Sequence, residues 1–106
     1  MRLNAAVHRK LELENPMKKY VIERVVAGIG ASDQKGLSAV AHQSNDALAK
    51  LRPRIQWQES YVTGDKTFCI YLADDEAVIR EHARLSGFPA NVITEVTAVI
   101  DPSTAT

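Results

Sequence analysis

The sequence predicts an α+β domain in which a four-stranded antiparallel sheet carries two helices on one face. Three observations predict it. Segments rich in β-branched and aromatic residues recur along the chain, segments with helical apolar spacing lie between them, and a Gly-Asp pair joins the two middle strands. The order is β-α-β-β-α-β, which is the ferredoxin-like arrangement. One sheet face then has no helix over it, and we call it the open face.

The first half of the chain supplies one strand and one helix. Residues 18–26, "KKYVIERVV", have the composition of a strand. The next segment, "GIGASD" (28–33), lacks the third glycine of a dinucleotide-binding loop, so we interpret it as a turn. Ser32 or Asp33 can cap a helix that continues to Leu51. Its apolar stripe consists of Leu37, Val40, Ala41, Ser44, Leu48 and Leu51.

The second half supplies the remaining elements. Residues 54–63 and 66–73 alternate like strands, and Gly64-Asp65 between them is typical of a two-residue hairpin turn. Residues 74–87 predict a helix, with an acidic first turn that suits the helix dipole and a glycine at its end. Residues 91–101 predict the last strand, which ends at a proline.

The hairpin turn pairs Tyr61 with Phe68, and residues at alternate positions then share a face. One face of the hairpin is more apolar and aromatic than the other, so we expect it to form the core beneath the helices. It carries Trp57, Glu59, Tyr61, Phe68, Ile70 and Leu72. The other face, with Ser60, Cys69 and Tyr71, is expected to be open.

In the first strand, Glu23 is costly to bury beneath helices, so Val21, Glu23 and Val25 are expected on the open face. The same argument assigns to that face the alternate residues of the last strand, namely Ile93, Glu95, Thr97 and Val99. An open face with this many apolar residues favours an interface. We therefore expect a homodimer that pairs its open faces and encloses a semi-polar pocket.

Length and composition restrict the function classes. With 106 residues the chain has the size of one domain, and 13 basic against 13 acidic residues argue against a dedicated nucleic-acid or membrane-surface protein. The single cysteine, Cys69, excludes an internal disulfide and a CxxC motif. No apolar run is long enough for a membrane span or a signal peptide, so a cytoplasmic location is expected.

The first residues differ from the rest. Residues 1–16 are polar and end in a turn-forming Asn-Pro pair, so we expect a flexible N-terminal extension before a single domain at 17–106. The alternative is an amphipathic arm, formed by Leu3, Val7 and Leu11, that docks on the domain or on a partner.

Several segments resemble a family of small bacterial proteins that is catalogued as a domain of unknown function, some members of which are named nickel-binding proteins. The segments are "YVIER", "IQWQESYVT", "KTFCIYLA", "REHARLSGFPAN" and "EVTAVIDPSTA", and they extend from about Met17 to Ala105. The resemblance implies a ferredoxin-like α/β sandwich, a homodimer and nickel(II) binding. Some relatives have a histidine where this chain has Glu59, so the chain departs from the family at this position, and Glu59 is a weaker candidate metal ligand.

Two histidines of the domain are further candidates. His82 lies between Ile79 and Leu85 at core spacing, and imidazole is a ligand that nickel(II) accepts well. The alternative is a packed histidine whose ring nitrogens form hydrogen bonds. His42 lies off the apolar stripe of the first helix, so it is expected in solvent and is a weaker candidate.

Glu23 and Glu95 are expected to lie close together, on neighbouring strands of the open face. Two such carboxylates repel, and the remedies are a shared proton with a raised pKa, a bound cation, a bridging arginine (Arg24 or Arg84), or solvent exposure.

These residues leave three hypotheses. The first is a non-enzymatic cytoplasmic protein that binds or sequesters nickel(II), with His82, Glu23, Glu95, His42 and Glu59 as candidate ligands. The second is a dimeric ferredoxin-like enzyme or small-molecule-binding protein, with isomerase- or monooxygenase-like chemistry on the open face. Glu23 or Glu95 would then act as acid or base, and Tyr71 would orient the substrate. The third is a face that serves only as a dimer interface. RNA recognition is disfavoured, since "KTFCIYLA" lacks the glycine and second aromatic residue of that motif.

Overall fold

A computed structural model describes residues 17–106, so the expected extension at 1–16 lies outside the described residues. It confirms the order β-α-β-β-α-β. The elements are β1 (Lys18–Val25), the 3-10 turn η1 (Ile29–Ala31), α2 (Gln34–Ala49), β2 (Ile55–Val62), β3 (Lys66–Ala73), α3 (Glu76–Ser86), β4 (Val92–Val96) and the 3-10 turn η2 (Pro102–Thr104).

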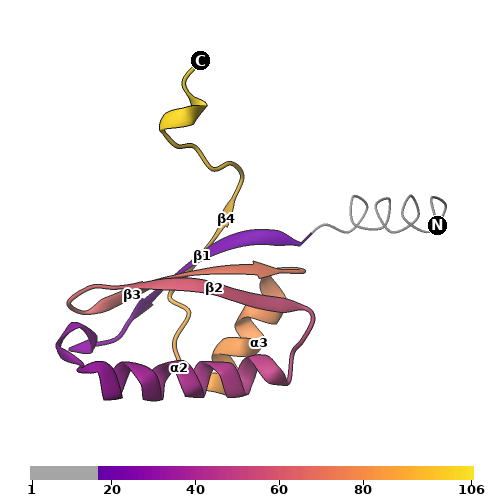
Figure 1. The fold of residues 1–106 in the computed structure, drawn as a ribbon. Helices are drawn as coiled ribbons and strands as arrows, with labels where there is room; N and C mark the ends of the chain where they lie inside the picture. Colours follow the sequence, from indigo (N-terminus) through magenta and orange to yellow (C-terminus); the bar gives the residue numbers. More distant parts are fainter. Residues whose placement is uncertain (1–16) are drawn as a thin grey trace, which may run out of the picture.

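The four strands form one antiparallel sheet in the order β2-β3-β1-β4, and α2 and α3 lie on the same side of it (Figure 1). The ferredoxin-like α+β prediction is therefore confirmed. The last strand is shorter than the predicted 91–101, because pairing with β1 ends at Val96. Beyond it the chain extends away from the sheet, with 70% of Val99 and 78% of Ile100 exposed (Figure 1). Among the described residues, no helix is both long and apolar enough to cross a membrane.

Local side-chain chemistry sets the helix ends. The Asp33 carboxylate accepts a hydrogen bond from the backbone N–H of Gly36 at 2.8 Å, and Asp75 caps α3 through Val78 N–H at 2.9 Å. Gly87 ends α3 with φ near +80°, a left-handed conformation that glycine adopts without strain.

The "GIGASD" segment forms η1 and packs against the β2–β3 turn. The backbone N–H of Gly30 donates to the Gly64 carbonyl at 3.0 Å, and a Cβ on Gly30 would lie 2.5 Å from the Thr63 carbonyl oxygen. Only glycine therefore permits this close approach of the two loops. The contact brings Ile29, which is buried, to the end of the sheet beside α2.

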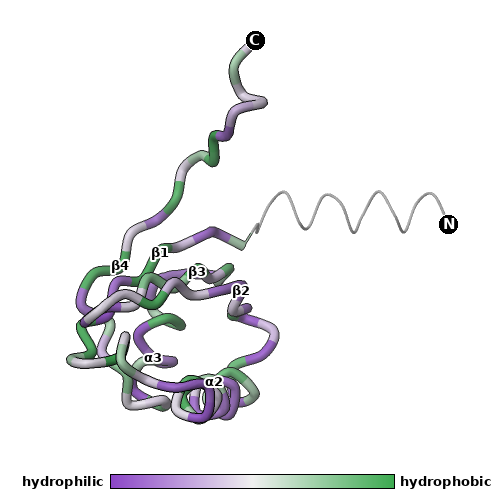
Figure 2. The backbone as a smooth tube through the Cα atoms, turned by 60° about the vertical axis from the view of Figure 1, so that its left-hand side comes forward, coloured by the Kyte–Doolittle hydropathy of each residue, from purple (hydrophilic) through white to green (hydrophobic). Residues whose placement is uncertain are grey.

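The helix-covered side of the sheet holds the core. Tyr20 and Ile22 of β1 and Tyr71 of β3 pack there against Val78 and Ile79 of α3. Figure 2 shows α2 and α3 on this side of the sheet, with green apolar segments in the strands above them.

The structure reverses the predicted faces of β3. Phe68, Ile70 and Leu72 were expected in the core, but they lie on the open face and are half-buried, whereas Cys69 and Tyr71 are buried under the helices. The register with β1 explains the reversal. Phe68 is directly opposite Glu23, and residues that face each other across an antiparallel pair share a face. The expectation that Val21, Glu23 and Val25 lie on the open face agrees with the burial pattern of β1.

The β2 assignment is wrong in part, for a different reason. The predicted pairing of Tyr61 with Phe68 is present, but a bulge at Gln58 shifts the register before Glu59, so that Trp57 pairs with Tyr71. Because of this extra residue, Trp57 packs against the core as predicted, while Glu59 and Tyr61 lie on the open face. Ser60 joins Cys69 on the helix-covered side.

The β4 assignment is wrong throughout the strand. Ile93 pairs with Ile22 and packs against the core, so it lies on the helix-covered side. Glu95 follows two residues later, opposite Tyr20, on the same side. Glu23 and Glu95 therefore lie on opposite faces of the sheet, and the carboxylate pair expected on the open face does not form.

Candidate functional site

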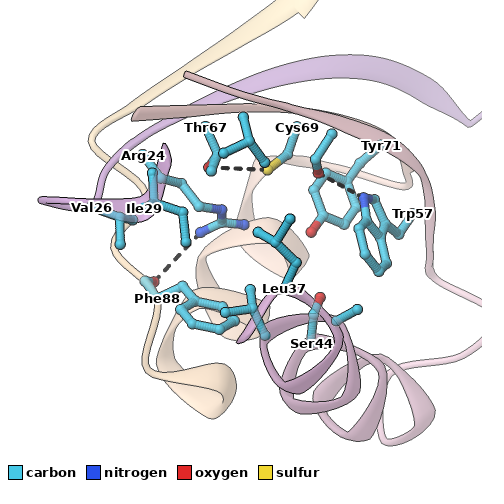
Figure 3. A pocket seen from close by; sticks show the side chains of 14 residues that line it. Arg24, Val26, Ile29, Leu37, Ser44, Trp57, Thr67, Cys69, Tyr71 and Phe88 are labelled. Carbon is cyan, nitrogen blue, oxygen red and sulfur yellow. Dashed lines mark hydrogen bonds between the residues drawn. The ribbon is translucent and has the colours of Figure 1, made fainter. Parts of the chain in front are cut away.

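A pocket of about 230 Å³ lies between the sheet and α2, on the helix-covered side (Figure 3). Its walls are mainly apolar. They come from η1, from the first half of α2, from the end of β2 and from the loop after α3, and include Ile29, Leu37, Val40, Ala41, Val62 and Phe88. Leu37, Val40 and Ala41 are only half-buried, in contrast to Ala47 and Leu48 further along α2. The first half of α2 therefore forms an incompletely filled part of the helix layer.

Arg24 of β1 points into this pocket (Figure 3) and is only 3% exposed. Its Nη1 donates to the Pro89 carbonyl at 2.7 Å and to the Phe88 carbonyl at 3.5 Å, and the guanidinium carbon lies 6.0 Å from the centre of the Tyr71 ring. None of the ion pairs found among residues 17–106 involves Arg24. Within that part of the chain, the groups that contact the Arg24 guanidinium are all neutral.

His82 lies behind Arg24 and is completely buried. Its Nδ1 is 3.5 Å from Arg24 Nη2, which can only donate, so Nδ1 is the acceptor. A neutral ring then carries its proton on Nε2, which lies 3.1 Å from Ser44 Oγ and donates to it. Burial and the charge of Arg24 lower the pKa of His82 to about 4, so the ring is neutral at pH 7.

Tyr71 completes this polar cluster, which consists of Arg24, His82, Ser44 and Tyr71. Its ring lies 5.4 Å from the His82 ring at a tilted angle, and burial raises the pKa of its hydroxyl. The sheet side of the pocket adds two further polar contacts. Trp57, the cross-strand partner of Tyr71, donates from Nε1 to Ser60 Oγ at 2.9 Å, and Thr67, the cross-strand partner of Arg24, has its Oγ1 3.5 Å from Cys69 Sγ. The pocket thus combines apolar walls with one buried cation.

The structure does not bring the predicted metal ligands together. His82 is buried with both ring nitrogens engaged. Glu23 on the open face accepts from Lys66 Nζ at 2.8 Å, and Glu95 is 3.8 Å from Lys18 Nζ on the other side. Within residues 17–106, no three His, Cys, Asp or Glu side chains gather as a metal shell. These residues therefore do not fit a nickel site inside one protomer.

The remaining candidates are exposed. Glu59 lies on the open face beside Tyr61, whose pKa it raises through a hydrogen bond to the hydroxyl. His42 is exposed on α2, as its place off the apolar stripe predicted. The bridging arginines are engaged elsewhere, since Arg24 points into the pocket and Arg84 pairs with Glu81.

The structure separates the residues that the enzyme hypothesis expected together on the open face. Tyr71 and Cys69 lie in the pocket on the helix-covered side, whereas Glu23 lies on the open face. Glu95 is on the helix-covered side but opposite Tyr20, and burial together with the charge of Glu95 raises the pKa of that tyrosine. No described carboxylate lines the pocket that contains Tyr71.

Arg24 was not predicted as a pocket residue, although the sequence contains a signal for it. Arg24 continues the alternation of Tyr20 and Ile22, which places it on the core side. Ser44 and His82 are likewise polar residues at core positions of the two helical stripes. Three polar residues at core positions of three elements indicate a buried polar cluster, but only the fold shows that they meet.

Residues 20–96 match the model of a family described as "Nickel responsive protein SCO4226-like". Among solved structures, the crystal structure of SCO4226 from Streptomyces coelicolor A3(2) is similar, with a TM-score of 0.61 and 20% sequence identity. The similarity covers 77% of this chain and 99% of that chain. No curated protein matches.

Proposed function

Because this chain belongs to the SCO4226-like family of nickel responsive proteins, we propose that it binds nickel(II) in the cytoplasm as a homodimer. The family match over residues 20–96 is the observation that carries the nickel assignment. The proposed role is sequestration or buffering of the ion.

The open face supports the homodimer. Phe68, Ile70 and Leu72 of its central strand are half-buried, and Tyr61 is 55% exposed at one side. Apolar surface of this kind is typical of an interface, and a two-fold dimer would cover it with the same surface of a second copy. The segment after β4 presents Val99 and Ile100 to solvent, and a second copy would cover these residues too.

The proposed ligands are Glu23 and Glu59 of the open face, since His82 is engaged by Arg24 and Ser44. Glu23 and Glu59 share the open face but are separated by β3, which puts their strands roughly 10 Å apart. Two carboxylates alone do not complete a nickel shell, and within residues 17–106 no third His, Cys, Asp or Glu side chain gathers with them. Face-to-face packing of two copies supplies carboxylates from both sides, which is how we propose that the ion is held.

The test is a calorimetric titration of the full chain with nickel(II), zinc and copper(II), together with a native mass. We expect saturable nickel binding by a dimer, and its loss in the Glu23→Gln/Glu59→Gln variant. Ile70→Lys, which places a charge in the open face, is expected to abolish both the dimer and the binding. Glu76→Gln, on the exposed side of α3, is the matched control and is expected to bind normally.

Three outcomes would overturn parts of this proposal. Absence of saturable nickel binding by the unaltered protein would remove the function. Binding by a monomer at full affinity would remove the role of the open face. Loss of binding in His82→Gln or in His42→Ala, with the glutamate variant unaffected, would move the site to the helices.

A further inference from the structure

We propose that the pocket between the sheet and α2 binds a small apolar carboxylate whose acid group pairs with Arg24. This site is separate from the proposed nickel function, because a buried guanidinium repels a metal cation. The occupant is an aromatic or short aliphatic monocarboxylic acid.

Arg24 carries a buried positive charge that no described residue neutralises. Its side chain is 97% buried, and among residues 17–106 the neighbours of its guanidinium are two backbone carbonyls, a neutral imidazole and the Tyr71 ring. Burial of a cation is costly unless an anion compensates it. A guanidinium has five N–H donors in a planar fork that matches a carboxylate. A bound carboxylate would supply the negative charge that the described residues do not.

The environment around Arg24 fixes the chemistry of the rest of the ligand. Val26, Ile29, Leu37, Val40, Val62 and Phe88 provide apolar wall, with Trp57 at the far side (Figure 3). A volume of about 230 Å³ is below the range of about 300–1,000 Å³ that is common for drug-sized ligands. The ligand is therefore compact, with one charged end and one apolar end, and phosphate-bearing nucleotides are too large and too polar.

The polar cluster behind Arg24 holds the guanidinium in place. Arg24 Nη2 donates a hydrogen bond to His82 Nδ1, and His82 Nε2 in turn donates to Ser44 Oγ. Because His82 is neutral at pH 7, it adds no second positive charge that would favour a dianion. The cluster therefore favours a ligand with a single carboxylate.

Trp57 is the only tryptophan of the chain and it lines the pocket, so its fluorescence reports occupancy directly. The test titrates the full chain with phenylacetate and, as the uncharged analogue of the same shape, with phenylacetamide. We expect saturable changes with phenylacetate and at least tenfold weaker binding of the amide. Arg24→Met is expected to weaken phenylacetate binding at least tenfold and to remove the preference for the acid.

Two further variants keep the test decisive. Arg80→Gln removes an exposed arginine of α3 and is expected to leave both affinities unchanged. Ala41→Phe narrows the pocket from α2 without touching Arg24, and calorimetry is expected to show loss of both ligands. Equal affinity of acid and amide in the unaltered protein would overturn the proposal even if Arg24→Met fails to fold. So would the absence of saturation, or full phenylacetate binding in Ala41→Phe.

Discussion

The two faces of the sheet are both rich in apolar residues, yet they meet different surroundings. The helix-covered face buries Ile22, Cys69 and Tyr71 completely or nearly so, and it also buries a charged residue, Arg24. The open face carries Phe68 and Ile70, which are half-buried, and an ion pair between Glu23 and Lys66 that reaches solvent. Hydrophobicity alone therefore does not select the core face of a strand. What selects it is the partner that each side chain finds across the sheet.

The largest effect is expected at Ile79, which is fully buried beneath the helix-covered face. Ile79→Ala leaves a cavity in the core and is expected to lower the free energy of unfolding by about 2–5 kcal/mol. The effect is expected at all protein concentrations, as measured by urea denaturation. Ile70→Ala on the open face is the matched variant. Its cost is expected to be smaller in dilute protein, and equal costs at both positions would contradict the distinction between the faces.

The buried cluster is also expected to make stability depend on pH. His82 has a pKa of about 4 in the folded protein against 6.5 when exposed, with Arg24 of β1 and Tyr71 of β3 facing it. Between pH 6.5 and pH 4, His82 is protonated in the unfolded chain but neutral in the folded protein. The stability present above pH 6.5 is therefore lost as pH falls toward 4, by about 3 kcal/mol at roughly 1.4 kcal/mol per pKa unit.

Urea denaturation at pH 7.0 and at pH 5.0 measures this dependence, since most carboxylates titrate below that interval. His82→Gln removes the titrating group, so its stability is expected to change less between the two values. His42→Gln, on the exposed side of α2, is the control and is expected to retain the dependence. If the stability of His82→Gln changed with pH as much as that of the unaltered protein, the pH dependence would come from groups other than His82.

Ser44→Ala removes a single hydrogen bond of the buried polar cluster. The hydroxyl accepts from His82 Nε2 at 3.1 Å, and its loss leaves a buried donor without that partner. We expect a cost of about 1–3 kcal/mol. Ser38→Ala, at an exposed position of the same helix, is expected to cost little. Thermal and urea denaturation would both show the difference, and similar costs for the two serines would contradict the role of the cluster.

The smallest effect is expected from the open-face ion pair. Lys66 Nζ lies 2.8 Å from Glu23 Oε1, but both side chains reach solvent. In dilute protein, where the proposed dimer is dissociated, Lys66→Ala is expected to lower the free energy of unfolding by less than about 1 kcal/mol, and this cost is expected to fall further in high salt. A larger, salt-independent cost in urea denaturation of dilute protein would contradict the solvent exposure of this ion pair in the monomer.

The order of the elements and most of their ends follow from the sequence, because the forces that set them act over a few residues. Asp33 and Asp75 cap the helices, Gly87 ends α3, and Gly64-Asp65 turns the hairpin, each through neighbouring backbone groups. The burial of His82 was equally predictable from its spacing between Ile79 and Leu85.

The tertiary structure alone decided which face of the hairpin is buried and which polar residues meet. Both faces of β3 are apolar, so only its register with β1, a strand about 45 residues earlier, separates Phe68 from Tyr71. The bulge at Gln58 then turns Glu59 away from Trp57. Arg24, Ser44 and His82 come from three distant segments, and no local rule joins them. Their contacts depend on the packing of α2 and α3 over the sheet, which decides where a buried charge finds its acceptors.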